Sequence, residues 1–107
     1  MATYLMLSHL TAEGKKSVKE TWEPDRLKEQ NREVETFGAK VLAQYALLGP
    51  YDFITMVEAP NPETVARLSV ELGRRGLAQY ETFPAIPVET FMASLKAPRH
   101  AEVATPR

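Results

Sequence analysis

One histidine and one carboxylate are the residues of this chain best placed to do acid–base chemistry together. His9 and Glu58 each stand near the end of an apolar segment. We predict that the two segments are parallel neighbouring strands, so that both side chains reach one edge of a sheet, close to Lys40, Gln79 and Glu81. A histidine beside a carboxylate is typical of an acid–base pair or of part of a metal site. The alternative is that Glu58 caps or pairs with the following turn and His9 fills a strand end.

The sequence offers little else to a metal ion. It contains no cysteine, and its second histidine, His100, lies in the last ten residues. A first-row metal held by one histidine and one or two carboxylates would need ligands from a partner subunit. We therefore predict no metal site, and the sequence indicates no cofactor.

Two tyrosines and one aspartate are further candidates for a binding site. Tyr45 and Tyr80 could line a cavity with their hydroxyls as polar handles, or could simply pack in the core. Asp52 follows the Gly49–Pro50 turn. A short carboxylate there is suited to accept backbone N–H groups and hold the hairpin, although it could also bind a ligand beside Tyr51.

No nucleotide-binding loop, catalytic triad, metal box or nucleic-acid motif accompanies these residues. Catalytic residues are thus unknown, with His9 and Glu58 as candidates, and the sequence favours a protein that is not an enzyme. The candidate ligand-binding residues are His9, Tyr45, Glu58 and Tyr80.

The elements that would position these residues follow a β-α-β-β-α-β order. Strands are predicted over 3–10, 40–48, 51–58 and 77–83, with helices over 24–37 and from Pro62 to Gly76. Asn61 is a favourable N-cap ahead of Pro62, and Gly38 and Gly76 suit helix C-termini. Residues 11–14 form a capped turn, followed by a loop with some helical character, and a short helix covers 88–95. This order predicts an α+β, ferredoxin-like fold with a four-stranded antiparallel sheet and two helices on one face.

Both faces of that sheet are expected to be apolar. Phe53 and Val57 alternate with Ile54 and Met56 along one strand. Two helices cover only one face, so a second copy of the sheet or the helix at 88–95 must cover the other. We expect a homodimer or a higher multiple, and Phe53→Asp or Val57→Asp is expected to weaken assembly or unfold the chain.

The bulk composition of the 107 residues is that of one globular domain. Apolar residues make up 44% and charged residues 25%, with a net charge of −1. A net charge near zero does not indicate a surface that binds nucleic acid. No apolar run approaches the ~20 residues of a membrane span. We expect a soluble cytoplasmic protein in which residues 1–97 form a single domain and residues 98–107 a mobile tail.

Several motifs of this chain resemble those of the GYD domain family. The similarity lies in Gly49-x-Tyr51-Asp52, in Val57 to Asn61, in Thr11 to Gly14 and in Glu81-Thr82, within residues 3–95. The resemblance implies a fold of the dimeric α/β-barrel type. It brings no established catalytic residues with it.

Three functions remain open at this point. The first is a small homo-oligomeric binding or regulatory module with a small-molecule ligand at the barrel or subunit interface. The second is a small dimeric-barrel enzyme of the monooxygenase or isomerase type, and the third is a purely structural assembly protein. This architecture hosts all three.

Overall fold

A computed structural model describes residues 1–21, 24–96 and 98 of the chain. Most of the predicted tail, 98–107, lies outside the described residues. Eight elements follow one another along the described part: β1 (Ala2–Leu10), α1 (Ala12–Thr21), α2 (Pro24–Thr36), β2 (Lys40–Ala46), β3 (Phe53–Ala59), α3 (Pro62–Gly73), β4 (Ala78–Ala85) and α4 (Val88–Leu95).

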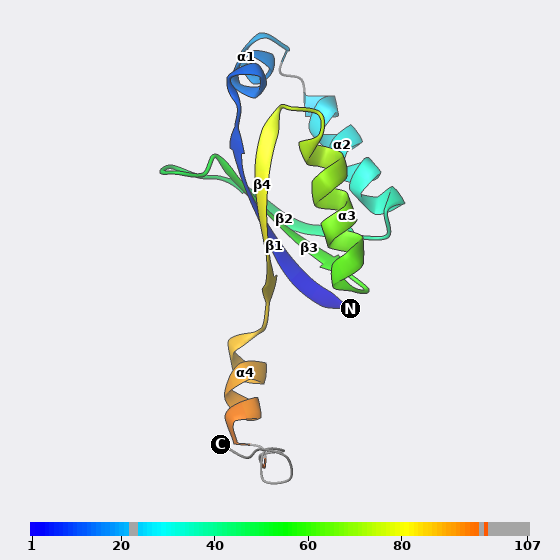
Figure 1. Ribbon diagram of the computed structural model, residues 1–107, viewed down its shortest axis with the longest axis vertical. Coiled ribbons are helices and arrows are strands. Elements are labelled where there is room, and N and C mark those ends of the chain that lie inside the picture. The colour runs from blue at the N-terminus through cyan, green and yellow to red at the C-terminus, as the bar shows by residue number, and fades with distance from the viewer. Residues whose placement is uncertain (22–23, 97, 99–107) are drawn as a thin grey trace.

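The four strands form one antiparallel sheet in the order β2-β3-β1-β4. Helices α2 and α3 pack on one of its faces, and none of the described helices covers the other (Figure 1). This is the ferredoxin-like arrangement that the element order predicted. We call the side of the sheet that packs against α2 and α3 the helix face, and the opposite side the open face.

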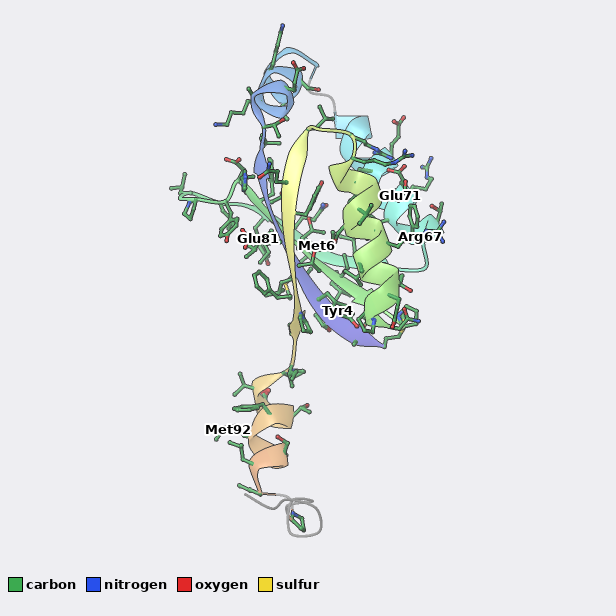
Figure 2. The ribbon with its side chains drawn as sticks, in the orientation of Figure 1. Tyr4, Met6, Arg67, Glu71, Glu81 and Met92 are labelled. Carbon is green, nitrogen blue, oxygen red and sulfur yellow. The ribbon has the colours of Figure 1, made fainter. Side chains whose placement is uncertain are left out.

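The core lies between the helix face and the helices. Its largest fully buried side chains are Met6 of β1, Val57 of β3, and Val65 and Leu68 of α3. Tyr4, Val34, Ala39, Ala59 and Leu72 complete this cluster. Figure 2 shows Tyr4 and Met6 on β1 beside the helix layer. Val65, Leu68 and Leu72 thus form the apolar stripe by which α3 packs on the sheet.

Helix α1 differs from the expectation of a capped turn followed by a loop. The Thr11 hydroxyl accepts the Gly14 N–H at 3.1 Å, as predicted, but the helix continues to Thr21. Thr11 also donates its own N–H to the Leu77 carbonyl at 3.0 Å, which ties the start of α1 to the strand β4 region. Most described side chains of α1 are exposed or half-buried. A helix that packs so few side chains needs no apolar stripe, and without such a stripe its sequence does not identify it as a helix.

Helix α3 begins as the sequence predicted. Asn61 has extended backbone geometry, and its side-chain oxygen accepts the Thr64 N–H at 2.9 Å and the Thr64 hydroxyl at 2.8 Å. The helix ends earlier than predicted, at Gly73, with Arg74 as its C-cap. Gly76 lies in the turn that follows and has a φ of 77°, in the region that favours glycine.

We expect Asn61→Ala to lower the free energy of unfolding by about 1 kcal/mol, because the Thr64 N–H loses its acceptor. Asn61→Asp retains an acceptor next to the positive end of the helix dipole and should stay near neutral. Urea denaturation of both variants measures the difference. Equal stability of all three proteins would mean that this cap contributes nothing in solution.

The last element extends away from the rest of the molecule (Figure 1). No side chain of α4 is buried, and the Cα radius of gyration is 17.4 Å. A compact chain of this length would have a radius of about 13 Å. The alternative that this helix folds back over the open face is therefore wrong for this chain, and the open face has no cover among the described residues. No helix in the described part is long and apolar enough to cross a membrane.

Candidate functional site

The predicted meeting of His9 and Glu58 does not occur, because β1 and β3 run antiparallel. Glu58 pairs with Thr3, six residues before His9 along β1. At ~3.3 Å per residue, this separates the two by roughly 20 Å. Both residues lie on the open face but at opposite ends of it. The parallel pairing was wrong because the crossover joins β1 to β2, and the hairpin then reverses the chain into β3.

His9 lies instead beside β4. Its Nε2 is 2.9 Å from Oε1 of Gln79, the residue that pairs with it across the two strands. Nearby, the Tyr51 hydroxyl donates to Glu81 Oε2 at 2.8 Å, and this hydrogen bond, with the charge on Glu81, raises the pKa of Tyr51. These contacts form a polar rim at one end of the open face. No group of three or more potential metal ligands occurs among the described residues.

Asp52 has the structural role that its position after the turn indicated. Its Oδ2 accepts the Leu10 N–H at 2.7 Å, while its own N–H donates to the Ser8 carbonyl at 2.8 Å. The Asp52 carbonyl accepts the Leu47 N–H at 2.8 Å, which closes the hairpin. Asp52 therefore joins the β2–β3 turn to β1. All three of these hydrogen bonds are made to backbone groups of other residues.

A cavity of about 600 Å³ opens between the helix face and the first three helices. Cavities that hold small ligands typically measure about 300–1,000 Å³. Its apolar wall includes Leu10, Val18, Phe53, Leu72 and Leu77, and its polar wall includes Ser8, Gln30, Glu33, Gln44, Thr55, Arg75 and Tyr80. This amphipathic lining is typical of a site that buries an apolar body and orients a polar group.

Charged and titratable groups lie along one side of this cavity. Arg75 forms an ion pair with Glu33 of α2, which raises the pKa of the Arg75 guanidinium. Burial raises the pKa of Tyr80, although a hydrogen bond with Gln30 and the charge on Arg75 partly oppose it. Tyr80 is thus a neutral hydroxyl at ordinary pH, suited to hydrogen-bond a ligand and unsuited to act as a base.

Only one of the two candidate tyrosines presents its side chain to the cavity. Tyr80 pairs with Ser8 on the helix face. Tyr45 borders the cavity in β2 but pairs with Ile54, whose neighbour Leu7 belongs to the open face. Alternation along β2 therefore turns the Tyr45 side chain to the opposite face from Tyr80.

The sequence did not predict the Glu33–Arg75 ion pair or the side-chain hydrogen bonds of Asn31 and Gln44. Asn31 donates to Gln44 Oε1 at 3.0 Å, and Gln44 donates to the Thr55 hydroxyl at 3.4 Å. Glu33 and Arg75 are 42 residues apart in sequence. No local spacing signal connects residues that only the packing of α2 on the sheet brings together.

The open face is the second candidate site. The strand registers place Leu5 and Leu7 of β1, Ile54 and Met56 of β3, and Phe83 of β4 on it together. Phe53 and Val57 are on the helix face, where Val57 is completely buried. Val57→Asp therefore addresses the core and Phe53→Asp the cavity wall. The substitution that tests assembly belongs at Met56 instead.

These features define a small α+β domain of ferredoxin-like fold, with one face of the sheet open and a cavity under the helices of the other. The chain belongs to the GYD domain family, whose family model matches residues 4–95.

One relative is similar over almost the whole chain. The "Glutamine synthetase and cystathionine beta-lyase binding protein" of Thermus thermophilus is 46% identical over 97 residues, which cover 90% of this chain and all of the relative.

Two solved structures share the fold. A crystal structure of an FFRP protein matches with a TM-score of 0.53 and 24% identity, covering 80% of this chain and all of that one. The crystal structure of TTHA0845 from Thermus thermophilus matches with a TM-score of 0.50 and 19% identity, covering 81% of this chain and 95% of that one. At these identities the matches establish the fold alone.

Proposed function

We propose that this GYD-domain protein is a homo-oligomeric binding module that associates through its open face and binds an enzyme. The observation that carries the proposal is the apolar open face, which no described element of the chain covers. Monomeric soluble proteins rarely leave a contiguous apolar patch of more than a few hundred Å² in water. A second copy of the same sheet is the simplest cover.

The relative supports the choice of an enzyme as the further partner. Its name states that it binds glutamine synthetase and cystathionine beta-lyase, and it aligns over its full length with this chain. We infer that this chain binds an enzyme of one of these two kinds. An acid–base pair of His9 and Glu58 is not favoured, since the two residues lie at opposite ends of the open face.

A second candidate function is the binding of a small ligand in the cavity beneath the helices. Its size and its mixed polar and apolar lining support this. Such a ligand would contact Ser8, Gln44 and Tyr80 on the helix face, on the other side of the sheet from the open face. It could therefore regulate the module without competing with self-association.

Native mass spectrometry tests these functions in one series of spectra. We expect the purified protein to appear as a dimer or a multiple of a dimer, and to form a complex with glutamine synthetase or cystathionine beta-lyase from its own source. An unrelated oligomeric enzyme at the same concentration serves as the control. If the protein assembles but binds neither enzyme, a purely structural assembly protein is the function that remains. A monomer would contradict the proposed assembly.

The ligand question is answered in the same series. We expect a small added mass on each subunit of the wild-type protein, and its loss in Ser8→Leu, which fills the cavity with a larger apolar side chain. Circular dichroism of Ser8→Leu controls for unfolding, because overpacking costs about 1–3 kcal/mol. An added mass that persists in this variant would place the ligand outside the cavity.

A further inference from the structure

Helix α4 carries an apolar surface that the described residues of its own chain leave uncovered. Five large apolar side chains of this segment are 49–68% exposed, namely Ile86, Val88, Phe91, Met92 and Leu95. Four of them recur at the i, i+3, i+4, i+7 spacing of a single helix face, while Thr90 and Ala93 lie on the opposite side. Figure 2 shows Met92 on this helix, well away from Tyr4 and Met6 in the core.

The connection to β4 directs this helix away from its own sheet. Strand β4 stays paired with β1 as far as Ala85 and Thr3, so only Ile86 and Pro87 separate the sheet from α4. A proline fixes its own φ, and it holds the residue before it in an extended conformation. The link therefore continues outward from the strand, and the open face of the same subunit is not the surface that α4 covers.

An isolated helix of this kind has little intrinsic stability. It contains eight residues, and Pro87 at its N-cap provides no side-chain hydrogen bond. Isolated helices shorter than ~12–15 residues are marginal in water, and in proteins most helical stability comes from packing. To stay folded, the helix therefore has to pack against a partner that is present whenever the chain is folded. A second copy of the chain meets this requirement, whereas an enzyme that binds and leaves does not.

We propose that residues 86–95 form an exchange arm, whose apolar face packs on a second copy of this chain. The area is sufficient for this. Five side chains with about 100 Å² of uncovered surface each give roughly 500 Å² per arm. Two arms and the surfaces that they cover would bury roughly 2,000 Å², comparable to a standard stable interface of about 1,600 ± 400 Å². The inference rests on the proposed self-association. It gives the two subunits a second contact, in addition to the one through their open faces.

A photo-crosslinking experiment identifies the surface that the arm touches. Phe91→p-benzoylphenylalanine is prepared with natural isotopes, mixed with ¹⁵N-labelled protein, allowed to exchange subunits and irradiated. We expect covalent dimers in which residue 91 is joined to a ¹⁵N-labelled peptide. The same photoreactive residue at Thr90, on the other side of the helix, is the matched control and should give a several-fold lower yield. Crosslinks confined within one chain, or no crosslink, would overturn the arm.

Substitution on the two sides of the helix provides the second measurement. Phe91→Asp should weaken the self-association constant about tenfold or more, because a charge enters an apolar contact, whereas Thr90→Asp should leave it unchanged. Sedimentation velocity measures both. Unchanged assembly of Phe91→Asp, including the case in which only enzyme binding is lost, would overturn the arm while leaving the proposed assembly intact. A monomeric wild-type protein would instead contradict both.

Discussion

Replacing Gly14 with alanine is expected to lower the free energy of unfolding by about 3 kcal/mol, at the upper end of the usual cost of overpacking. A Cβ at this position would lie 1.8 Å from the Leu77 carbonyl oxygen and 2.8 Å from its carbon. These are backbone atoms and cannot rotate away. The same carbonyl accepts the Thr11 N–H, so the collision also breaks the hydrogen bond that anchors α1.

Gly73→Ala is the matched control for this prediction. Gly73 also lies in a helix, but a Cβ there would meet no atom within 4 Å. Alanine is favoured over glycine in helices by about 0.5–1 kcal/mol, so this variant should be neutral or slightly stabilised. Both variants should be compared by urea denaturation at one protein concentration, because the stability of an oligomer depends on concentration. A Gly14→Ala protein as stable as wild type would mean that α1 does not lie against Leu77 in solution.

The second large effect is expected at the open face. Met56→Asp should weaken self-association at least about 100-fold, because a two-fold interface would place two unpaired carboxylates in an apolar contact. Met56 pairs with Leu5 and Ala43 in the middle of the sheet, and it is only half-buried in the single chain. The isolated subunit should therefore tolerate the charge and remain folded.

Val70→Asp is the control, because Val70 is 66% exposed on α3 and lies on the other side of the molecule from the open face. It should assemble like the wild-type protein. Sedimentation equilibrium measures the constants, and circular dichroism confirms that both variants are folded. If Met56→Asp assembles as tightly as Val70→Asp, the open face is not the self-association surface.

The two substitutions at the assembly surfaces separate the roles of the sheet and the arm. Met56→Asp acts on the open face and Phe91→Asp acts on α4, which the structure keeps apart. If both contacts contribute independently, the double variant should show the sum of the two free-energy losses. This arrangement would leave the cavity under the helices unaffected, since its polar residues face the other side of the sheet.

Local chemistry was sufficient to predict the architecture. Asn61 and Pro62 mark the start of α3, because capping and a fixed proline φ are properties of single residues. The apolar alternation of β3 likewise predicted which side chains share a face. Asp52 could be assigned a backbone-binding role from its position beside the turn alone.

The candidate sites depended on tertiary structure. His9 and Glu58 could be judged as a pair only once the relative direction of β1 and β3 was known, and that direction reversed the expectation. The cavity, the Glu33–Arg75 pair and the separation of Tyr45 from Tyr80 arise from contacts between segments distant in sequence. Residue types and spacings determine local conformation, whereas strand order and helix packing determine which side chains meet. The sequence by itself therefore established the fold and family of this protein, and only the tertiary structure located its cavity, its open face and its projecting helix.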